Sequence, residues 1–290
     1  MKPAPFDYVL ARSAAEAEEA LAHHGDAAKV LAGGQSLVPL LNFRLARPGV
    51  LVDINGAREL DAIAEAGGEL RVGALARLRA LERWAAVRVP LVAEALRLVG
   101  HPAIRVRGTV VGSLVHADPA AELPALLLCL DGAVVARSAR GGERLIGAER
   151  LYVAPLTTTL RPDELAVEAR FRLPSPGTGW GFAEVARRHG DFALAGSVAL
   201  LALGDEGRVS RVRLGFFGVG GVPVRGGDGE ATLVGQAPTP ERLRAAGQAA
   251  AAALQPDGDL HATAEYRRRV AAVLAERTLT AAVRRCQRAA

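Results

Sequence analysis

Two adjacent glycines, Gly33 and Gly34, follow a short apolar run and precede a helical segment, an arrangement that could bind an anion. Residues 29–37 have the sequence Lys-Val-Leu-Ala-Gly-Gly-Gln-Ser-Leu. Without Cβ atoms the two glycines allow a tight turn and a close approach to a ligand. If residues 30–32 form a strand and Ser36 caps the next helix, free N–H groups and the helix dipole favour a nucleotide diphosphate.

Taken alone, paired glycines between a strand and a helix more often form a plain turn than an anion site. The spacing Gly-x-Gly-x-x-Gly of a Rossmann fold is absent, and no Gly-Lys-Ser/Thr follows as in a Walker loop. Other segments must therefore support the interpretation.

A second informative segment covers residues 104–121 and is too polar and too interrupted by Gly and Pro for one ordinary element. It contains Asp118, and Glu122 follows it, but Pro119 lies between the two carboxylates, so they need not share a helical face. These carboxylates suit hydrogen bonds to hydroxyl groups. His116 and His101 could act as acid–base groups, although a structural or hydrogen-bonding role is favoured for His116.

The surrounding segments alternate between strand and helix patterns and predict an α+β chain. Strands or strand-like apolar runs are expected at residues 6–10, 30–32, 50–54, 63–66, 69–73, 133–137, 165–173, 182–188, 192–203 and 209–218. Helices are expected at residues 14–24, 37–45, 78–87, 90–99, 125–130, 240–254 and 263–288. Residues 174–179, Pro-Ser-Pro-Gly-Thr-Gly, form the clearest linker and mark a domain boundary.

Composition restricts the function classes. The 290 residues are 50% apolar, enough for two domains and a sizeable core. The N-terminus lacks a signal-peptide core and the apolar stretch 192–204 is too short to span a bilayer, so a cytoplasmic protein is predicted. Two distant cysteines, Cys129 and Cys286, cannot ligate an iron–sulfur cluster or a structural zinc ion, so no metal site is expected.

The net charge of +5 raises the possibility of a nucleic-acid-binding protein. Lys and Arg total 36, of which only Lys2 and Lys29 are lysines, and the arginines are spread along the chain. Seven Phe, three Tyr and two Trp provide few rings for stacking on bases. The densest basic group, around residues 267–269 and 284–288, is interpreted as a solvated or subunit-facing helix surface.

Three segments in register, residues 29–37, 109–124 (TVVGSLVHADPAAELP) and 187–193 (RRHGDFA), resemble the FAD-binding medium subunit of molybdenum hydroxylases. That family includes the medium subunits or domains of carbon monoxide dehydrogenase and xanthine dehydrogenase. The resemblance covers nearly the whole chain. It implies a vanillyl-alcohol-oxidase-type FAD-binding domain at residues 1–176, with α+β subdomains at about 1–55 and 56–176. A C-terminal domain with a three-stranded sheet and helices is implied at residues 177–290.

The resemblance also implies which residues contact FAD. The diphosphate would face the first loop and the second motif, and Glu122 and Asp118 would lie near the ribityl chain. Leu165 would flank the flavin, and Phe192 would lie near the isoalloxazine ring. The two diphosphate-binding sets are Val30, Leu31, Ala32, Gly33, Gly34, Gln35, Ser36 and Leu37, and Thr109, Val110, Val111, Gly112 and Ser113.

Two positions depart from the family pattern. Val111 stands where the family often has the first glycine of Thr-Ile-Gly-Gly, and a positive φ there would strain a β-branched residue. Gln35 stands where carbon monoxide dehydrogenases usually have His, which disfavours carbon monoxide as the substrate although the amide can still donate.

By this resemblance the chain carries FAD, receives electrons from the [2Fe–2S] clusters of a small subunit and passes them to an external acceptor. A large molybdenum-cofactor subunit would oxidise the substrate, and a dimer of heterotrimers is expected. The chain needs no catalytic residue of its own for this role. A stand-alone FAD-dependent oxidoreductase is the alternative, but no substrate pocket with a base is evident. Neither a nucleic acid nor a membrane is an expected partner.

Overall fold

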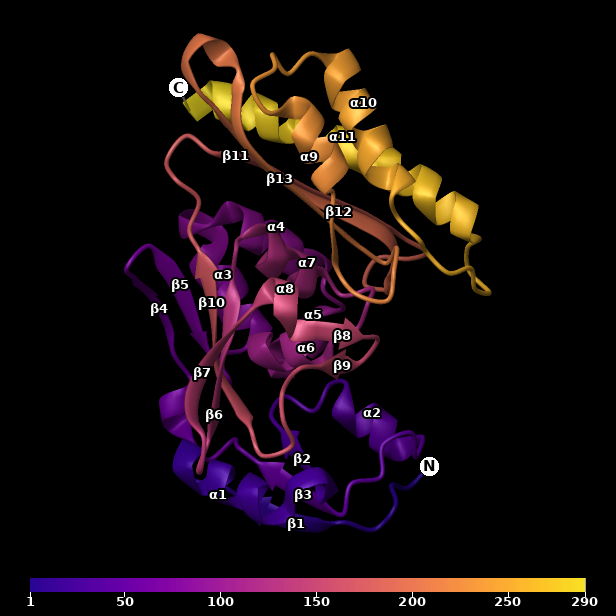
Figure 1. The fold of residues 1–290 in the computed structure, drawn as a ribbon. Coiled ribbons are helices and arrows are strands. Elements are labelled where there is room, and N and C mark those ends of the chain that lie inside the picture. The colour runs from indigo at the N-terminus through magenta and orange to yellow at the C-terminus, as the bar shows by residue number, and fades with distance from the viewer. Residues whose placement is uncertain (290) are drawn as a thin grey trace. The chain divides into compact units, whose positions relative to one another are not determined.

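The computed structural model describes residues 1–289, which divide into two compact units built from non-contiguous segments (Figure 1). Unit 1 contains residues 1–84, 101–116 and 132–172. Unit 2 contains residues 85–100, 117–131 and the chain from residue 173 onward. Residue 290, at the end of the predicted C-terminal domain, lies outside the described residues.

The elements of unit 1 are mainly strands with short helices. The strands are β1 (Asp7–Leu10), β2 (Ala28–Leu31), β3 (Val50–Asp53), β4 (Ile63–Ala66), β5 (Glu69–Gly73), β6 (Ala133–Ser138), β7 (Gly142–Gly147), β8 (Tyr152–Ala154), β9 (Thr157–Thr158) and β10 (Leu165–Arg172). The helices are α1 (Ala14–His24), α2 (Leu37–Asn42), α5 (Pro102–Arg107), α6 (Val110–His116) and α8 (Ala148–Leu151), with 3-10 turns η1 (Gly25–Ala27) and η2 (Arg58–Leu60). Helix α3 (Leu78–Arg88) begins in unit 1 and ends in unit 2.

A three-stranded parallel sheet in the order β1-β3-β2 positions the first glycine segment. The central strand β3 carries the run Val50-Leu51-Val52, which is almost wholly buried, as expected for the middle strand of a parallel sheet. Parallel strands end at the same edge, so the chain after β2 and the chain after β3 leave the sheet side by side.

A second sheet of unit 1 is antiparallel, in the order β4-β5-β10-β6-β7. The hairpin predicted at residues 63–73 is confirmed as β4 and β5, which are joined by Gly67 and Gly68 at positive φ. Helix α1 was predicted with its bounds, and Ser13 caps it by accepting the N–H of Glu16 at 3.2 Å. Helix α6 contacts β5 and β10, which places the second glycine-containing segment against this sheet.

Unit 2 is a sheet with helices on both faces. Its strands are β11 (Gly179–Ala186), β12 (Ala193–Leu203), β13 (Val209–Phe217) and β14 (Val224–Arg225), paired in the order β11-β12-β13-β14. Its helices are α4 (Pro90–Leu98), α7 (Glu122–Cys129), α9 (Gly227–Leu233), α10 (Pro240–Ala252) and α11 (Ala264–Ala289), with a 3-10 turn η3 (Asp205–Gly207). The prediction of a three-stranded sheet is wrong, because the chain after β13 returns and adds β14, a fourth strand of two residues.

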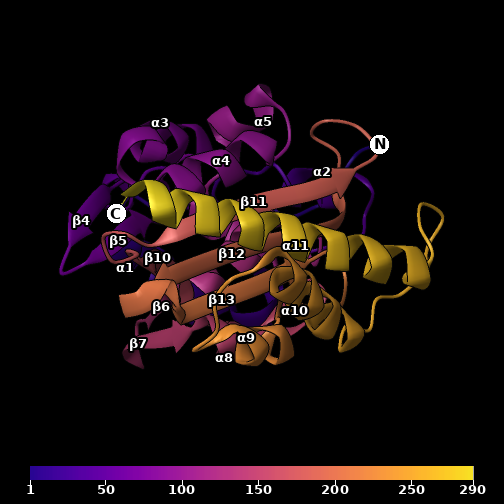
Figure 2. The same cartoon turned by 90° about the horizontal axis from the view of Figure 1, so that it is seen from above.

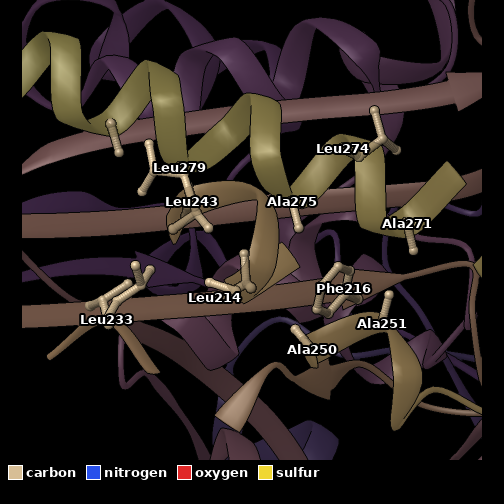
Figure 3. Close-up of a cluster of buried hydrophobic side chains, with 14 of the residues drawn as sticks. Leu214, Phe216, Leu233, Leu243, Ala250, Ala251, Ala271, Leu274, Ala275 and Leu279 are labelled. Carbon is tan, nitrogen blue, oxygen red and sulfur yellow. The ribbon is translucent and has the colours of Figure 1, made fainter. Parts of the chain in front are cut away.

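Helices α9, α10 and α11 cover one face of this sheet, and α4 and α7 contact the other (Figures 1 and 2). Leu214 and Phe216 of β13 meet Leu243 of α10 and Leu274 and Leu279 of α11 in the core (Figure 3). Long helix α11 approaches β11 very closely, because a Cβ atom on Gly179 or Gly181 would overlap carbonyl oxygens of this helix. The two glycines therefore allow α11 to pack in close contact with β11.

Both cysteines lie in unit 2 and are buried free thiols, Cys129 at the end of α7 and Cys286 on α11. Burial raises the pKa of the Cys129 thiol to about 12, so it is a small apolar side chain, as predicted. The predicted basic surface on α11 is only partly correct. Arg267 is 8% exposed and donates to two backbone carbonyls, and Arg285 stacks 3.4 Å from the centre of the Trp180 ring.

Candidate functional site

The first turn, residues 32–37, connects the carboxyl end of β2 to α2 and includes the first residue of that helix. Gly34 adopts φ +72°, a conformation that favours glycine, and the backbone reverses direction there. Within the described chain, none of the five N–H groups from Gly33 to Leu37 donates a hydrogen bond to the protein. Five donors in one turn are available to an external acceptor, which is the arrangement that an anion needs.

Two details of the first turn differ from the sequence-based expectation. Ser36 occupies the position before α2, but its side chain makes no capping hydrogen bond. Helix α2 ends at Asn42 rather than at residue 45, because Arg44 adopts φ +58°. Gln35 is exposed, and its Nε2 atom donates to the carbonyl oxygen of Gly33 at 3.2 Å, so its amide belongs to the turn.

The second turn, residues 107–109, joins α5 to α6 and lies directly against the first. A Cβ atom on Gly33 would lie 2.6 Å from the carbonyl oxygen of Arg107 and 3.0 Å from the nitrogen of Thr109. Such distances are shorter than side-chain contacts allow. The fold of unit 1 therefore brings together the first two of the three segments, which are about seventy residues apart in sequence.

Helix α6 begins immediately after the second turn. The Thr109 side chain accepts the N–H of Gly112 at 3.2 Å, so it caps the first turn of the helix. Val110, Val111 and Leu114 are buried, whereas Gly112 and Ser113 are half-buried. Val111 is helical, so the strain expected from a positive φ does not arise, and its side chain packs into unit 1. The segment 104–121, left without an assigned element, contains two short helices.

Three of the predicted site residues lie in unit 2: Asp118, Glu122 and Phe192. The Oδ1 atom of Asp118 accepts the N–H of Ala120 at 2.8 Å and forms a tight turn before α7. Glu122 begins α7 and is 7% exposed. Burial, followed by the charges of Glu184 and Asp118, raises the pKa of Glu122 to about 8. At neutral pH the Glu122 carboxyl holds its proton and can donate as well as accept.

Sequence reasoning did not identify Glu184, which faces the same group of carboxylates. It lies on β11, one of its carboxylate oxygens is buried without a hydrogen-bond partner, and burial raises its pKa to about 7. Its sequence context, one acid within a strand, gives no sign of this environment.

The two residues expected beside the flavin occupy different units. Leu165 begins β10 of unit 1 and is 1% exposed. Phe192 follows Asp191 in the segment between β11 and β12 of unit 2, and 72% of its surface is exposed. A large exposed aromatic ring next to a buried strand suits contact with another planar group.

The histidines considered as acid–base groups are at the ends of helices. His101 precedes α5 and is exposed, and His116 is the last residue of α6 and is half-buried. Arg187 is exposed and contacts the Nδ1 atom of His261 at 2.8 Å, and it pairs with Asp191 at 4.0 Å. Within the described residues, no group of three or more His, Cys, Asp or Glu side chains could hold a metal ion.

Two further residues that the sequence did not indicate lie behind the two turns. Asn55 follows β3 and donates from Nδ2 to the carbonyl oxygen of Ala32 at 2.9 Å. Arg77 donates to the carbonyl oxygen of Arg107 at 2.6 Å and to the Oδ1 atom of Asn55 at 2.7 Å. The position of Asn55 after a buried strand was a usable signal, but nothing in the sequence paired it with Arg77.

The chain matches the family described as the FAD binding domain in molybdopterin dehydrogenase over residues 4–176, which is more than half of its length. The chain belongs to this family. Residues 180–282 match the C-terminal domain of the carbon monoxide dehydrogenase flavoprotein. The resemblance drawn from the three segments is thereby confirmed, and the cofactor of the family is FAD.

Relatives align over almost the full length. The chain is 42% identical to the alpha subunit of the 6-hydroxypseudooxynicotine dehydrogenase complex of Paenarthrobacter nicotinovorans, covering 99% of this chain and 97% of the relative. It is 40% identical to the beta subunit of caffeine dehydrogenase from a Pseudomonas species, covering 81% and 80%. The structure of carbon monoxide dehydrogenase from Hydrogenophaga pseudoflava superimposes with a TM-score of 0.95 at 35% identity, covering 99% and 100%.

These similarities make the chain a medium FAD subunit of the molybdenum hydroxylase type and an oxidoreductase. Its fold is a mixed α/β arrangement with an FAD-binding and a C-terminal domain. None of the helices in the described chain has both the length and the hydropathy required to cross a membrane.

Proposed function

We propose that this chain holds FAD as an electron-transfer subunit, receives electrons from the [2Fe–2S] clusters of a small subunit and delivers them to an external acceptor. One observation carries the proposal: two distant turns meet, and the first leaves five N–H groups without a protein acceptor. A diphosphate is the part of FAD that matches such a set of donors. When bound, FAD supplies the redox centre that the protein side chains lack.

The chain's own residues bind and orient the cofactor in this proposal. Residues 30–37 and 109–113 surround the diphosphate. The N–H groups of residues 33–37, which are unpaired within the described chain, bind it, because the N–H groups of Val110, Gly112 and Ser113 already donate within the protein. Asp118 and Glu122 bind hydroxyl groups of the ribityl chain, and the proton on Glu122 lets it donate to an oxygen there. Leu165 and Phe192 contact the isoalloxazine ring.

The domain division and the assembly complete the proposal. FAD binding belongs to residues 1–176, with subdomains at about 1–55 and 56–176, and residues 177–290 form the C-terminal domain. A large molybdenum-cofactor subunit and a small iron–sulfur subunit are the partners, in a dimer of heterotrimers. Similar FAD chains occur in dehydrogenases named for 6-hydroxypseudooxynicotine, caffeine and carbon monoxide, so the substrate is set outside this chain.

The proposal is tested in two steps. The purified chain, stripped of flavin and titrated with FAD, should take up one FAD per chain and gain a visible flavin absorbance. A chain that stays colourless at saturating FAD would refute flavin binding. Mixing the FAD-loaded chain with its reduced small subunit should then bleach the flavin absorbance rapidly. If the flavin instead stays oxidised with the small subunit but is reduced by an alcohol or NADH alone, the stand-alone oxidoreductase is the correct alternative.

A further inference from the structure

Arg77 and Asn55 form a continuous side-chain connection between the two turns of unit 1. One nitrogen of the Arg77 guanidinium donates to the carbonyl oxygen of Arg107 in the second turn at 2.6 Å. The other donates to the Oδ1 atom of Asn55 at 2.7 Å. Asn55 in turn donates to the carbonyl oxygen of Ala32 in the first turn at 2.9 Å. Three hydrogen bonds therefore link carbonyls that belong to segments far apart in sequence.

The amide of Asn55 is held in one orientation. The Oδ1 atom of Asp53 accepts two hydrogen bonds from Asn55, one from the backbone N–H at 2.8 Å and one from the side-chain Nδ2 at 2.6 Å. The other oxygen of Asp53 accepts the hydroxyl of Tyr8 at 2.7 Å. The Nδ2 atom faces a carboxylate and a carbonyl, and the Oδ1 atom faces a guanidinium. Flipping the amide would place its NH₂ group against the guanidinium donor and its oxygen against two acceptors.

The Arg77 backbone adds a second connection to the same turn. Residue 77 forms an isolated β-bridge with Thr109, in which Leu78 donates to the Gly108 carbonyl at 2.9 Å and Val110 donates to the Ala76 carbonyl at 3.1 Å. The backbone therefore fixes where the second turn lies, and the Arg77 side chain fixes its distance from the first. A planar guanidinium with two donors at a fixed separation suits this task, which the single ammonium of lysine cannot reproduce.

We propose that Arg77 and Asn55 are positioning residues for the FAD diphosphate: acting through the Ala32 and Arg107 carbonyls, they set the spacing of the two turns and touch no cofactor atom. This inference rests on the proposed function. The N–H groups from Gly33 to Leu37 make no hydrogen bond within the described chain, so the first turn is held through its carbonyls. Those of Gly34 and Ser36 accept from the start of α2, and among the described residues only Asn55, which follows β3, donates to the turn from another part of the chain. A carbonyl contact on its far side is the available means of holding it in place before FAD arrives.

The test uses the full chain without flavin and measures the Kd for FAD and for ADP, which contains a diphosphate but no flavin. Arg77→Met, Arg77→Lys and Asn55→Ala should each weaken FAD binding by about tenfold or more, since each removes a hydrogen bond of a charged or fixed group. Binding of ADP should weaken by the same factor. The double variant Arg77→Met/Asn55→Ala should weaken binding by much less than the product of the two factors, because both residues act in one connection.

Arg79→Met is the matched control, because Arg79 lies two residues further along and its guanidinium donates to Glu82 at 2.6 Å rather than to a carbonyl of either turn. It removes the same charge and should leave the Kd within about twofold. If Arg77→Lys and Asn55→Ala lower the melting temperature yet bind FAD within about twofold of wild type, their role is only structural and the inference is wrong. Failure of the wild-type chain to bind FAD would instead refute the proposed function itself.

Discussion

A Cβ atom placed on Gly33 would lie 2.8 Å from the Cα atom of Gly108. The two glycines come from segments that are remote in sequence, and backbone contacts backbone at this point with no space for a side chain. The contact explains why residue 33 is glycine. It also means that a single methyl group at residue 33 must separate the two turns.

Gly33→Ala and Gly33→Val should therefore reduce FAD retention. Overpacking of about 1–3 kcal/mol at this contact corresponds to a loss of affinity of roughly tenfold, and more for valine. Visible flavin absorbance per purified chain, followed by a titration, measures the effect. Gly147→Ala is the control, because Gly147 has an ordinary negative φ and a Cβ atom there would meet nothing within 4 Å. A Gly33→Val chain as yellow as wild type would contradict the assignment of the first turn.

The stability of the flavin-free chain should fall as pH rises, because of Glu122. Its ordinary pKa of 4.5 is raised to about 8 in the folded chain, so the folded state holds a proton that the unfolded state has released between these values. The contribution of this group is fully present below its unfolded pKa and is lost as pH rises through the folded value, on the order of 3–5 kcal/mol in all.

Glu122→Gln isolates this contribution, because glutamine has the same shape and no titration. The variant should match wild type near about pH 5 and exceed it in unfolding free energy near about pH 9. Urea denaturation at the two pH values supplies the comparison, and other titrating groups cancel in the difference. Two stability curves that stay parallel across this range would show that Glu122 ionises normally.

Arg267 should be required for the stability of unit 2. Its guanidinium donates to the carbonyl oxygens of Leu194 at 2.6 Å and Gly218 at 2.9 Å, and pairs with Asp259 at 2.7 Å. Arg267→Met removes the donor to the buried Leu194 carbonyl and the half-buried Gly218 carbonyl and should cost about 3 kcal/mol or more in unfolding free energy. The control Arg269→Met removes an exposed guanidinium from the same helix and should change stability by less than about 0.5 kcal/mol. Equal denaturation midpoints for the two variants would be inconsistent with this role.

Restoring the glycine that the family often has at position 111 should harm this chain. Val111→Gly removes a buried side chain and places glycine inside helix α6, at a combined cost of roughly 2–4 kcal/mol. Val115→Gly, in the same helix at a half-buried position, should cost less. Calorimetric melting of both variants, with FAD titration, measures stability and affinity together. Tighter FAD binding by the Val111→Gly chain would mean that a flexible turn is needed there.

Sequence patterns predicted the elements that depend on local chemistry. Ser13 and the spacing of apolar residues fixed helix α1, and paired glycines fixed the β4–β5 hairpin. Patterns failed where tertiary contacts decide. Helix α6 buries Val110, Val111 and Leu114, whereas the only buried residue of α5 is Arg105, so neither helix has a regular apolar stripe. Strand β14 is too short to leave a periodic signal.

The site was predicted unevenly for the same reason. Paired glycines indicate a position where the backbone approaches another group closely, so the first turn was recognisable from the sequence. Asn55 and Arg77 are common polar residues whose significance lies in partners 22 and 30 positions away. Arg267 was assigned to a surface because three consecutive arginines look solvated, and only the packed structure separates the buried member from its neighbours.

The two buried thiols offer a practical advantage. Cys129 and Cys286 are shielded in the native fold and lie in different sequence segments of unit 2. An alkylating reagent reaches them only when the surrounding structure opens. The natural chain therefore carries two built-in reporters, and the mass added at each cysteine over time would record how α7 and α11 come loose, with and without flavin, before any residue is replaced.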